Sequence, residues 1–173
     1  PDNLTALDEF TQWGGHVIFP MLHGSWGEGG GLQAILDARG LRYVGCRTDA
    51  AALCMDKHLA KQRLIEHGLP TPPSELLTTG QRAAMGPPVV VKPPCEGSSI
   101  DLTICRDEET LRRTRVRLRR RHARILVERF IEGMELTVGL IAPEDGSGFI
   151  ALPPIHIIPA TEFYDYNAKY ARD

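Results

Sequence analysis

Three consecutive valines at positions 89–91, followed by Lys92 and two prolines, constrain the fold of this chain more than any other segment. Consecutive β-branched residues favour a buried strand. Proline cannot continue the hydrogen-bonded ladder of a strand, so Pro93 turns the chain out into the loop at 94–99. The segment therefore predicts a buried strand with a lysine at its end.

The first half of the chain alternates helical patterns with short apolar runs. We expect helices at 4–13, 32–38, 48–53 and 57–67, and short strands at 17–19 and 43–44, the first of them buried. The strand–loop–helix–strand order at 17–44 is typical of α/β proteins and predicts a parallel sheet.

The second half is rich in strands and contains one helix. Strands are expected at 75–79, 89–92, 102–105, 125–130, 136–141 and 149–152, with a helix from Asp107 to about His122. This α+β pattern differs from the first half, and the boundary between the halves falls near 45–49.

Composition excludes several classes of protein. The net charge of −2 implies no overall attraction to nucleic acid or to anionic membranes, and no apolar run approaches the roughly 20 residues of a membrane helix. The first residues carry no basic and apolar signal-peptide pattern, and the four cysteines form no C-x-x-C pair. We expect reduced cysteines and a cytoplasmic protein.

The segment 106–124 holds nine arginines against three acids, which is the charge pattern of a nucleic-acid-binding helix. Leu111, Leu118 and His122 can share one face of that helix, which leaves the arginines in water. No aromatic platform accompanies them, so we favour a solvated helix face over a nucleic-acid site.

Four segments combine polar groups with turn residues, and each is also compatible with an ordinary surface turn. The glycine-rich segment 23–33 carries His23 and Glu28 where a helix start favours anions. Lys92 and the Gly97-Ser98-Ser99 turn offer donors to phosphate oxygens, although no Walker sequence is present. The hairpin 126–138 places Glu128 and Glu135 at its ends, and the tyrosine-rich segment 162–170 suggests a lid.

In their order and spacing these segments resemble the D-alanine–D-alanine ligase family of the ATP-grasp superfamily. His23 to Gln33 is similar to the family pattern H-G-x-x-G-E-D-G-x-x-Q, and Met55-Asp56-Lys57 matches M-D-K. Val91 to Ser99 matches V-K-P-x-x-x-G-S-S, Glu128 to Glu135 matches E-x-F/W-I/L-x-G-x-E, and Phe163 to Tyr170 matches F-Y-D-Y-x-x-K-Y. The resemblance covers nearly the whole chain from Val17 onward.

The resemblance implies a fold in three parts. These are a partial N-terminal α/β domain at 1–47, an α+β ATP-grasp central subdomain at 48–128, and the beginning of the C-terminal ATP-grasp subdomain at 129–173. It also implies that ATP phosphorylates the carboxylate of one D-alanine and that the amine of a second D-alanine then displaces the phosphate, which is a step in making peptidoglycan precursors.

The resemblance further implies a role for each matching residue. The residues implied to bind ATP are Lys57, Lys92, Glu96, Ser99, Glu128, Phe130, Ile131 and Glu135. Those implied to line the D-alanine site are His23, Glu28 and Lys169, and those implied to act in catalysis are Ser98 and Tyr170, which would hydrogen-bond each other when the lid closes.

The implied partners are small molecules: ATP with Mg²⁺ or Mn²⁺, and D-alanine. Family members are usually dimeric through their N-terminal region, so a homodimer is implied as well. The family's metal ligands lie in a final third that we expect beyond Asp173, and its first strand with a substrate-binding Glu lies before Pro1. We therefore expect a fragment of a longer protein.

Two positions depart from the family pattern, because Gly29 stands where Asp is usual and Asp101 stands where Gly is usual. Two other readings remain open: an ATP-grasp ligase that joins different amino acids, in which Lys92 and Glu128 would serve equally, and a ligase-like protein without catalysis.

Overall fold

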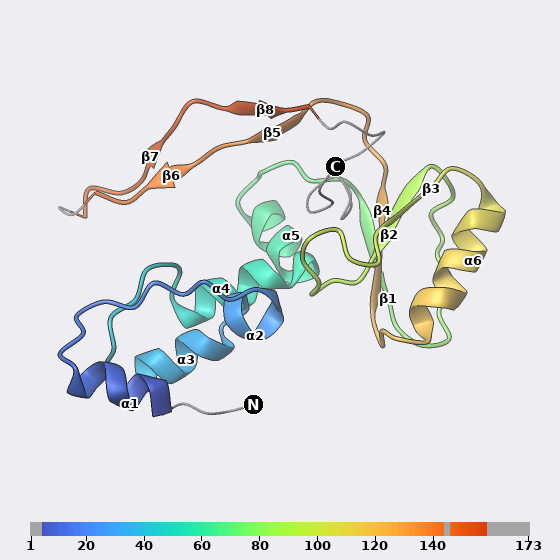
Figure 1. Ribbon diagram of the computed structural model, residues 1–173. Coiled ribbons are helices and arrows are strands. Elements are labelled where there is room, and N and C mark those ends of the chain that lie inside the picture. The colour runs from blue at the N-terminus through green and yellow to red at the C-terminus, as the bar shows by residue number, and fades with distance from the viewer. Residues whose placement is uncertain (1–4, 144–145, 159–173) are drawn as a thin grey trace.

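The computed structural model describes residues 5–143 and 146–158 (Figure 1). The first part of the chain contains the helices α1 (Thr5–Gln12), α2 (Gly24–Glu28), α3 (Gly31–Ala38), α4 (Thr48–Met55) and α5 (Lys57–Glu66). The second part contains the strands β1 (Ser74–Leu77), β2 (Val89–Lys92), β3 (Thr103–Cys105) and β4 (Ile125–Arg129), with helix α6 (Glu108–Arg119) between the last two.

The four strands form one antiparallel sheet in the order β1-β4-β2-β3. Side chains alternate between the two faces of a strand, so Val89 and Val91 point towards helix α6 and are fully buried, while Val90 is only partly buried on the opposite face. The core between sheet and helix comprises Leu77, Val89, Val91, Cys105, Leu111, Leu118, Ile125 and Val127. The predicted buried strand at 89–92 is confirmed, and its second face is free to line a pocket.

Helix α6 follows the signals of its sequence. Asp107 is the N-cap, and its carboxylate accepts a hydrogen bond from the Thr110 amide at 2.7 Å. Leu111 and Leu118 lie two turns apart on the same face, and both are buried against the sheet. The predicted helix is confirmed, although it ends at Arg119 rather than near His122.

The structure of the N-terminal part corrects three expectations. The run 17–19 forms no buried strand: Ile18 makes a single parallel bridge with Tyr43, and Val17 and Phe19 are 50% and 66% exposed. A run of three residues gains too few ladder hydrogen bonds to hold a strand without covering layers. The parallel sheet is therefore reduced to one bridge, and the glycine-rich segment expected as a loop contains helix α2.

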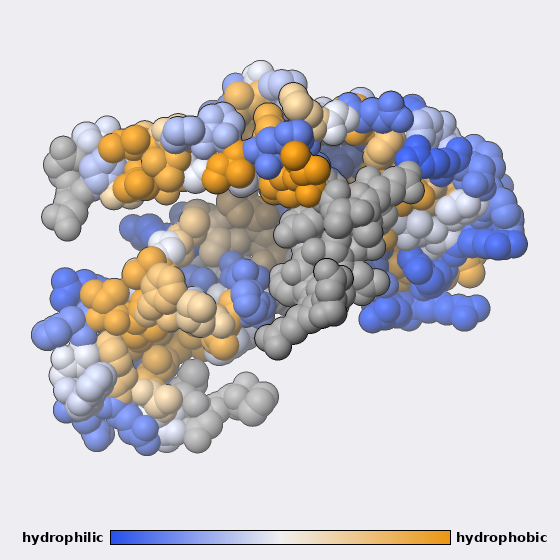
Figure 2. Space-filling view, turned by 45° about the horizontal axis from the view of Figure 1, so that its top comes forward, coloured by the Kyte–Doolittle hydropathy of each residue, from blue (hydrophilic) through white to orange (hydrophobic). Residues whose placement is uncertain are grey.

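The segment after the sheet forms a long antiparallel ribbon that extends from the sheet above the N-terminal helices (Figure 1). It pairs β5 (Glu135–Thr137) with β8 (Ile155–Ile157), and β6 (Leu140–Ile141) with β7 (Ile150–Ala151). The single strand expected at 136–141 is thus interrupted at 138–139, and β8 was not predicted. Large apolar side chains are exposed along the ribbon, as Figure 2 shows. Among the described helices, none is long and apolar enough to cross a membrane.

Asp56 joins helix α5 to the sheet. One carboxylate oxygen caps the helix by accepting hydrogen bonds from the amides of His58 at 2.9 Å and Leu59 at 3.3 Å. The other accepts from Arg124 Nη2 at 2.9 Å, directly before strand β4. Burial acts to raise the pKa of Asp56, but the bonds from Arg124 and the two amides outweigh it and lower the pKa. The side chain thus fixes the start of α5 against the sheet.

Substitutions of Asp56 separate its two contacts. Asparagine caps helices about as well as aspartate, so Asp56→Asn loses mainly the charge pair with Arg124, whereas Asp56→Ala loses the cap as well. We expect the free energy of unfolding to fall by about 1 kcal/mol for Asp56→Asn and by about 2–3 kcal/mol for Asp56→Ala. Urea unfolding of the two variants measures the difference, and equal losses would show that the cap contributes nothing.

Candidate functional site

A carboxylate held between two lysines lies on the face of the sheet opposite helix α6. Glu128 on β4 accepts a hydrogen bond from Lys92 Nζ at 2.8 Å and another from Lys61 Nζ at 2.6 Å. The strand register brings Val90 of β2 opposite Glu128, which places Lys92 two residues further along the neighbouring strand. Lys61 comes from helix α5 and also donates to Thr71 Oγ1. The three side chains are only 9–17% exposed.

The two lysines determine the charge state of Glu128. Burial acts to raise the pKa of the Glu128 carboxyl, but the hydrogen bonds from Lys61 and Lys92, together with their positive charges, outweigh it and lower the pKa. Glu128 is therefore ionised at neutral pH. Its two oxygens keep lone pairs that can accept further hydrogen bonds from a ligand.

A pocket of about 330 Å³ opens beside this cluster. Its floor is the second face of the sheet, and the chain leaving strand β4 forms one wall. The lining residues include Val90, Lys92, Ser99, Leu102, Ile104, Glu128, Phe130, Ile131 and Glu135. An apolar slot with a carboxylate at its inner end and a second carboxylate at its rim suits a planar heterocycle that carries an amino group and a polyol.

A second pocket, of about 230 Å³, is enclosed by the loop that follows strand β2. Lys57 and Lys92 point into it together with Glu96, Ser98 and Ser99. The Lys57 ammonium donates to the carbonyls of Pro94 and Glu96. Burial and then the nearby charge of Lys92 lower the pKa of Lys57. Two lysines at one small pocket make it attractive to an anion.

The shape of this loop depends on left-handed backbone conformations at three residues that are not glycine. Ser98, Ser99 and Asp101 have φ angles of 52°, 58° and 56°. Strained backbone of this kind is concentrated at ligand sites, where the surrounding structure holds it in place. The loop lies on the pocket side of the sheet, which fits a role in ligand contact.

A third pocket, of about 520 Å³, lies between the N-terminal helices and the same loop. His23 and Glu28 line it together with Lys57, Glu96 and Gly97. His23 Nδ1 is 3.7 Å from Glu28 Oε1, and the other Glu28 oxygen accepts from the Gly24 amide at 2.8 Å. The histidine and the glutamate therefore face each other across the start of helix α2.

The three pockets adjoin one another because they share lining residues. Lys92 and Ser99 belong to both the first and the second pocket, and Lys57 and Glu96 belong to both the second and the third. The shared residues define a continuous trough from Glu135 to His23. Figure 2 shows the molecule hollowed between the β5–β8 ribbon and the N-terminal helices.

The structure places the described site residues named from the sequence in this trough. The first two pockets contain Lys57, Lys92, Glu96, Ser98, Ser99, Glu128, Phe130, Ile131 and Glu135, and the third contains His23 and Glu28. Lys169 and Tyr170, with the rest of the segment 162–170, lie outside the described residues. The roles given to all of these residues remain predictions.

Lys61 is a site residue that the sequence analysis missed. As a whole residue it is 7% exposed, and its ammonium approaches Glu128 more closely than any other described cation does. The sequence feature that could have identified Lys61 is its position four residues after Lys57, because residues four apart lie on the same face of a helix. Lys57 lines the trough, and Lys61 supports it through the hydrogen bond to Glu128.

The two departures from the family pattern have local physical reasons. A Cβ atom at Gly29 would lie 2.4 Å from the Ser25 carbonyl oxygen, so this turn of the backbone requires glycine. Asp101 adopts the positive φ that glycine prefers, and its carboxylate is paired with His122 at 2.8 Å and Arg121 at 3.1 Å. The Asp101 carboxylate therefore has its partners outside the pocket that Lys57 and Lys92 line.

Comparison with known proteins places this geometry in a fold class. The structure of D-alanine–D-alanine ligase from Bacillus anthracis superposes with a TM-score of 0.78, at 31% identity, over 98% of this chain and 56% of that one. A structure of the enzyme from the same organism in complex with ATP gives a TM-score of 0.75 at 29% identity, covering 94% and 54% of the two chains. The chain has the mixed α/β fold of the ATP-grasp proteins.

The sequence comparisons define the family. The profile described as D-ala D-ala ligase C-terminus matches residues 64–173. D-alanine–D-alanine ligase from Laribacter hongkongensis is 42% identical over 161 residues, which cover 90% of this chain and 50% of that protein. The chain belongs to the D-alanine–D-alanine ligase family, and it spans about half the length of the curated relatives that it matches.

The pairing of Glu128 with Lys61 can be tested by its effect on stability. Lys61→Met removes one of the two cations on a mostly buried carboxylate, and we expect the free energy of unfolding to fall by about 2–3 kcal/mol. Arg63→Met, on the exposed side of the same helix, breaks only the surface pair with Glu66 and should cost at most about 0.5 kcal/mol. Urea unfolding compares the two, and equal losses would contradict the assignment.

The lowered pKa of Glu128 also predicts a pH dependence. A carboxyl whose pKa is lower in the folded than in the unfolded state adds stability above its unfolded pKa of about 4.3. That stability is lost as the pH falls through the folded pKa. We expect the stability of the wild type to decline below about pH 4, and Glu128→Gln to show a smaller decline in parallel unfolding curves. Identical pH profiles would show that Glu128 is not the responsible group.

Proposed function

We propose that the protein containing this chain is an ATP-dependent D-alanine–D-alanine ligase that supplies a precursor of peptidoglycan. The observation that carries the proposal is the trough of three adjoining pockets, in which an apolar slot, a pocket with two lysines and a pocket with a histidine and a glutamate follow one another. Membership of the ligase family supports it.

In this proposal the first pocket holds the nucleoside of ATP. The ionised carboxylate of Glu128 accepts a hydrogen bond from the adenine amino group, because Lys61 and Lys92 keep it charged and fixed. Phe130 and Ile131 line the slot beside the ring, and the backbone near Ile131 is within reach of the adenine edge. Glu135 at the rim accepts from the ribose hydroxyls.

The second pocket holds the triphosphate. Lys57 and Lys92 neutralise the phosphate oxygens, and the loop with Glu96, Ser98 and Ser99 covers them. Charge neutralisation and positioning are the main contributions a protein makes to phosphoryl transfer. Mg²⁺, or Mn²⁺ in its place, would accompany ATP and neutralise the charge that develops on the transferred phosphoryl group.

The third pocket holds D-alanine next to the phosphates. The γ-phosphoryl group passes to the carboxylate of one D-alanine, and ADP leaves. The amine of the second D-alanine attacks the acyl phosphate, so the amide bond forms as phosphate departs. His23 and Glu28 stand at this pocket with groups that can orient the substrate. Lys169 and Tyr170 complete the proposal as lid residues that close over Ser98.

The proposal includes a cytoplasmic location, the domain boundaries, a homodimer and the small-molecule partners. A ligase that uses ATP and precursors of the cell wall operates in the cytoplasm, and the four cysteines are free thiols, as they would be there. The division of the chain at 47/48 and 128/129 and the homodimer stay predictions. D-alanine and ATP are the proposed partners.

Activity of the full-length protein tests the proposal. With Mg²⁺, ATP and D-alanine it should release phosphate and form D-alanyl-D-alanine, which mass spectrometry detects. Lys92→Gln should reduce kcat/KM by about 100-fold or more, because one neutralising charge is lost from the transition state. Arg63→Gln, on the exposed side of helix α5, should leave the rate unchanged. Absence of the dipeptide from the wild-type reaction would overturn the proposal. So would a reaction with added D-lactate in which the wild type forms only the ester.

A further inference from the structure

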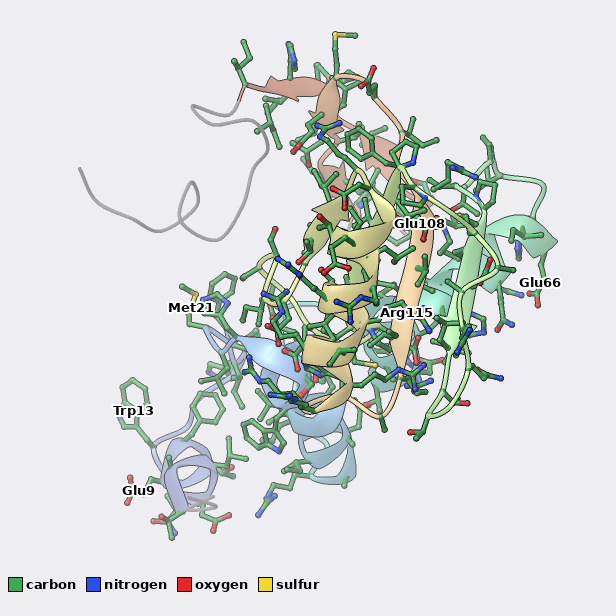
Figure 3. The ribbon with its side chains drawn as sticks, turned by 90° about the vertical axis from the view of Figure 1, so that its right-hand side faces the viewer. Glu9, Trp13, Met21, Glu66, Glu108 and Arg115 are labelled. Atoms are coloured by element: carbon green, nitrogen blue, oxygen red, sulfur yellow. The ribbon has the colours of Figure 1, made fainter. Side chains whose placement is uncertain are left out.

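A groove of about 1040 Å³ runs between helix α6 and the chain at 79–83. It lies on the helix side of the sheet, whereas the trough lies on the other side. Five arginines line it against two acids, Glu108 and Glu109; the arginines are Arg82, Arg112, Arg115, Arg119 and Arg120. Figure 3, in which helix α6 faces the viewer, shows Glu108 near one end of the helix and Arg115 about two turns along it.

Two of these arginines converge on one backbone carbonyl. Arg115 Nη2 and Arg119 Nη2 lie 2.9 Å and 3.5 Å from the Gln81 oxygen. Arg115 Nε and Arg119 Nη1 are buried and have no hydrogen-bond partner. Arg115 and Arg119 are half-buried, whereas Arg112, Arg113 and Arg117 of the same helix are exposed, as expected for a solvated face. The two unpartnered donors therefore set Arg115 and Arg119 apart from the other arginines of the helix.

The acids of the groove do not compensate these charges. Glu109 forms ion pairs with Arg112 at 2.8 Å and with Arg113 at 2.6 Å. Among the residues that the structure describes, no ion pair joins an acid to Arg115 or Arg119. Burial lowers the pKa of Arg119, and the nearby positive charge of Arg115 lowers it further.

We propose that this groove binds a phosphate group through Arg115 and Arg119, with Arg82 and Arg120 at its rim. Guanidinium groups present paired N–H donors that match the spacing of phosphate oxygens. A dianion in the groove would offset the adjacent positive charges of the two side chains, which both line it. The site is separate from the trough proposed for ATP, since the sheet lies between them.

The test is thermal unfolding of the full-length protein titrated with inorganic phosphate, at constant ionic strength and with Mg-ATP saturating the trough. Phosphate should raise the Tm, because a ligand that binds only the folded state stabilises it. The double variant Arg115→Gln/Arg119→Gln should weaken the apparent phosphate affinity about tenfold or more, since it removes two charge-assisted contacts.

The matched control is Arg113→Gln/Arg117→Gln, which removes the same charge from the same helix. Neither residue lines the groove, so the phosphate response should equal that of the wild type. Equal loss in both double variants, or no response in the wild type, would overturn the site. A single-stranded oligonucleotide that binds as tightly as phosphate, and with the same sensitivity in both double variants, would instead show a general basic surface. Dipeptide formation, measured in parallel, reports on the trough independently.

Discussion

The ionised carboxylate of Glu128, held between Lys61 and Lys92, is the interaction on which the candidate site depends. It joins helix α5 to two strands of the sheet and fixes the inner end of the first pocket. A buried carboxylate without partners would take up a proton and lose its value as an acceptor. The two lysines therefore serve both the packing of the fold and the chemistry of the site.

The sheet separates two surfaces of different character. One face is apolar and packs against helix α6, and the other carries the polar groups that line the trough. Strand alternation makes this possible, because residues next to each other in β2 and β4 point to opposite sides. The arginine groove lies on the helix side of the same strands, between helix α6 and the chain at 79–83. The two proposed anion sites thus share one structural support and no residues.

Much of the fold could be predicted from local signals. The valines of β2, the Asp107 cap and the leucine spacing of α6 each act within a few residues, and each prediction is confirmed. The run at 17–19 failed because a strand of three residues depends on neighbours that local sequence does not specify. Helix α2 was missed because its glycines favour a loop by propensity, whereas Glu28 stabilises the first turn by accepting from the Gly24 amide.

The sequence by itself determined the family, the strand that ends in Lys92 and the order of the polar segments, because these are properties of neighbouring residues and their spacing. Only the tertiary structure decided that Lys61 holds Glu128 and that Asp101 is hydrogen-bonded to His122 and forms an ion pair with Arg121. Those contacts join residues between 20 and 67 positions apart. Their energies depend on burial and on distances in space, and neither quantity is encoded in local sequence.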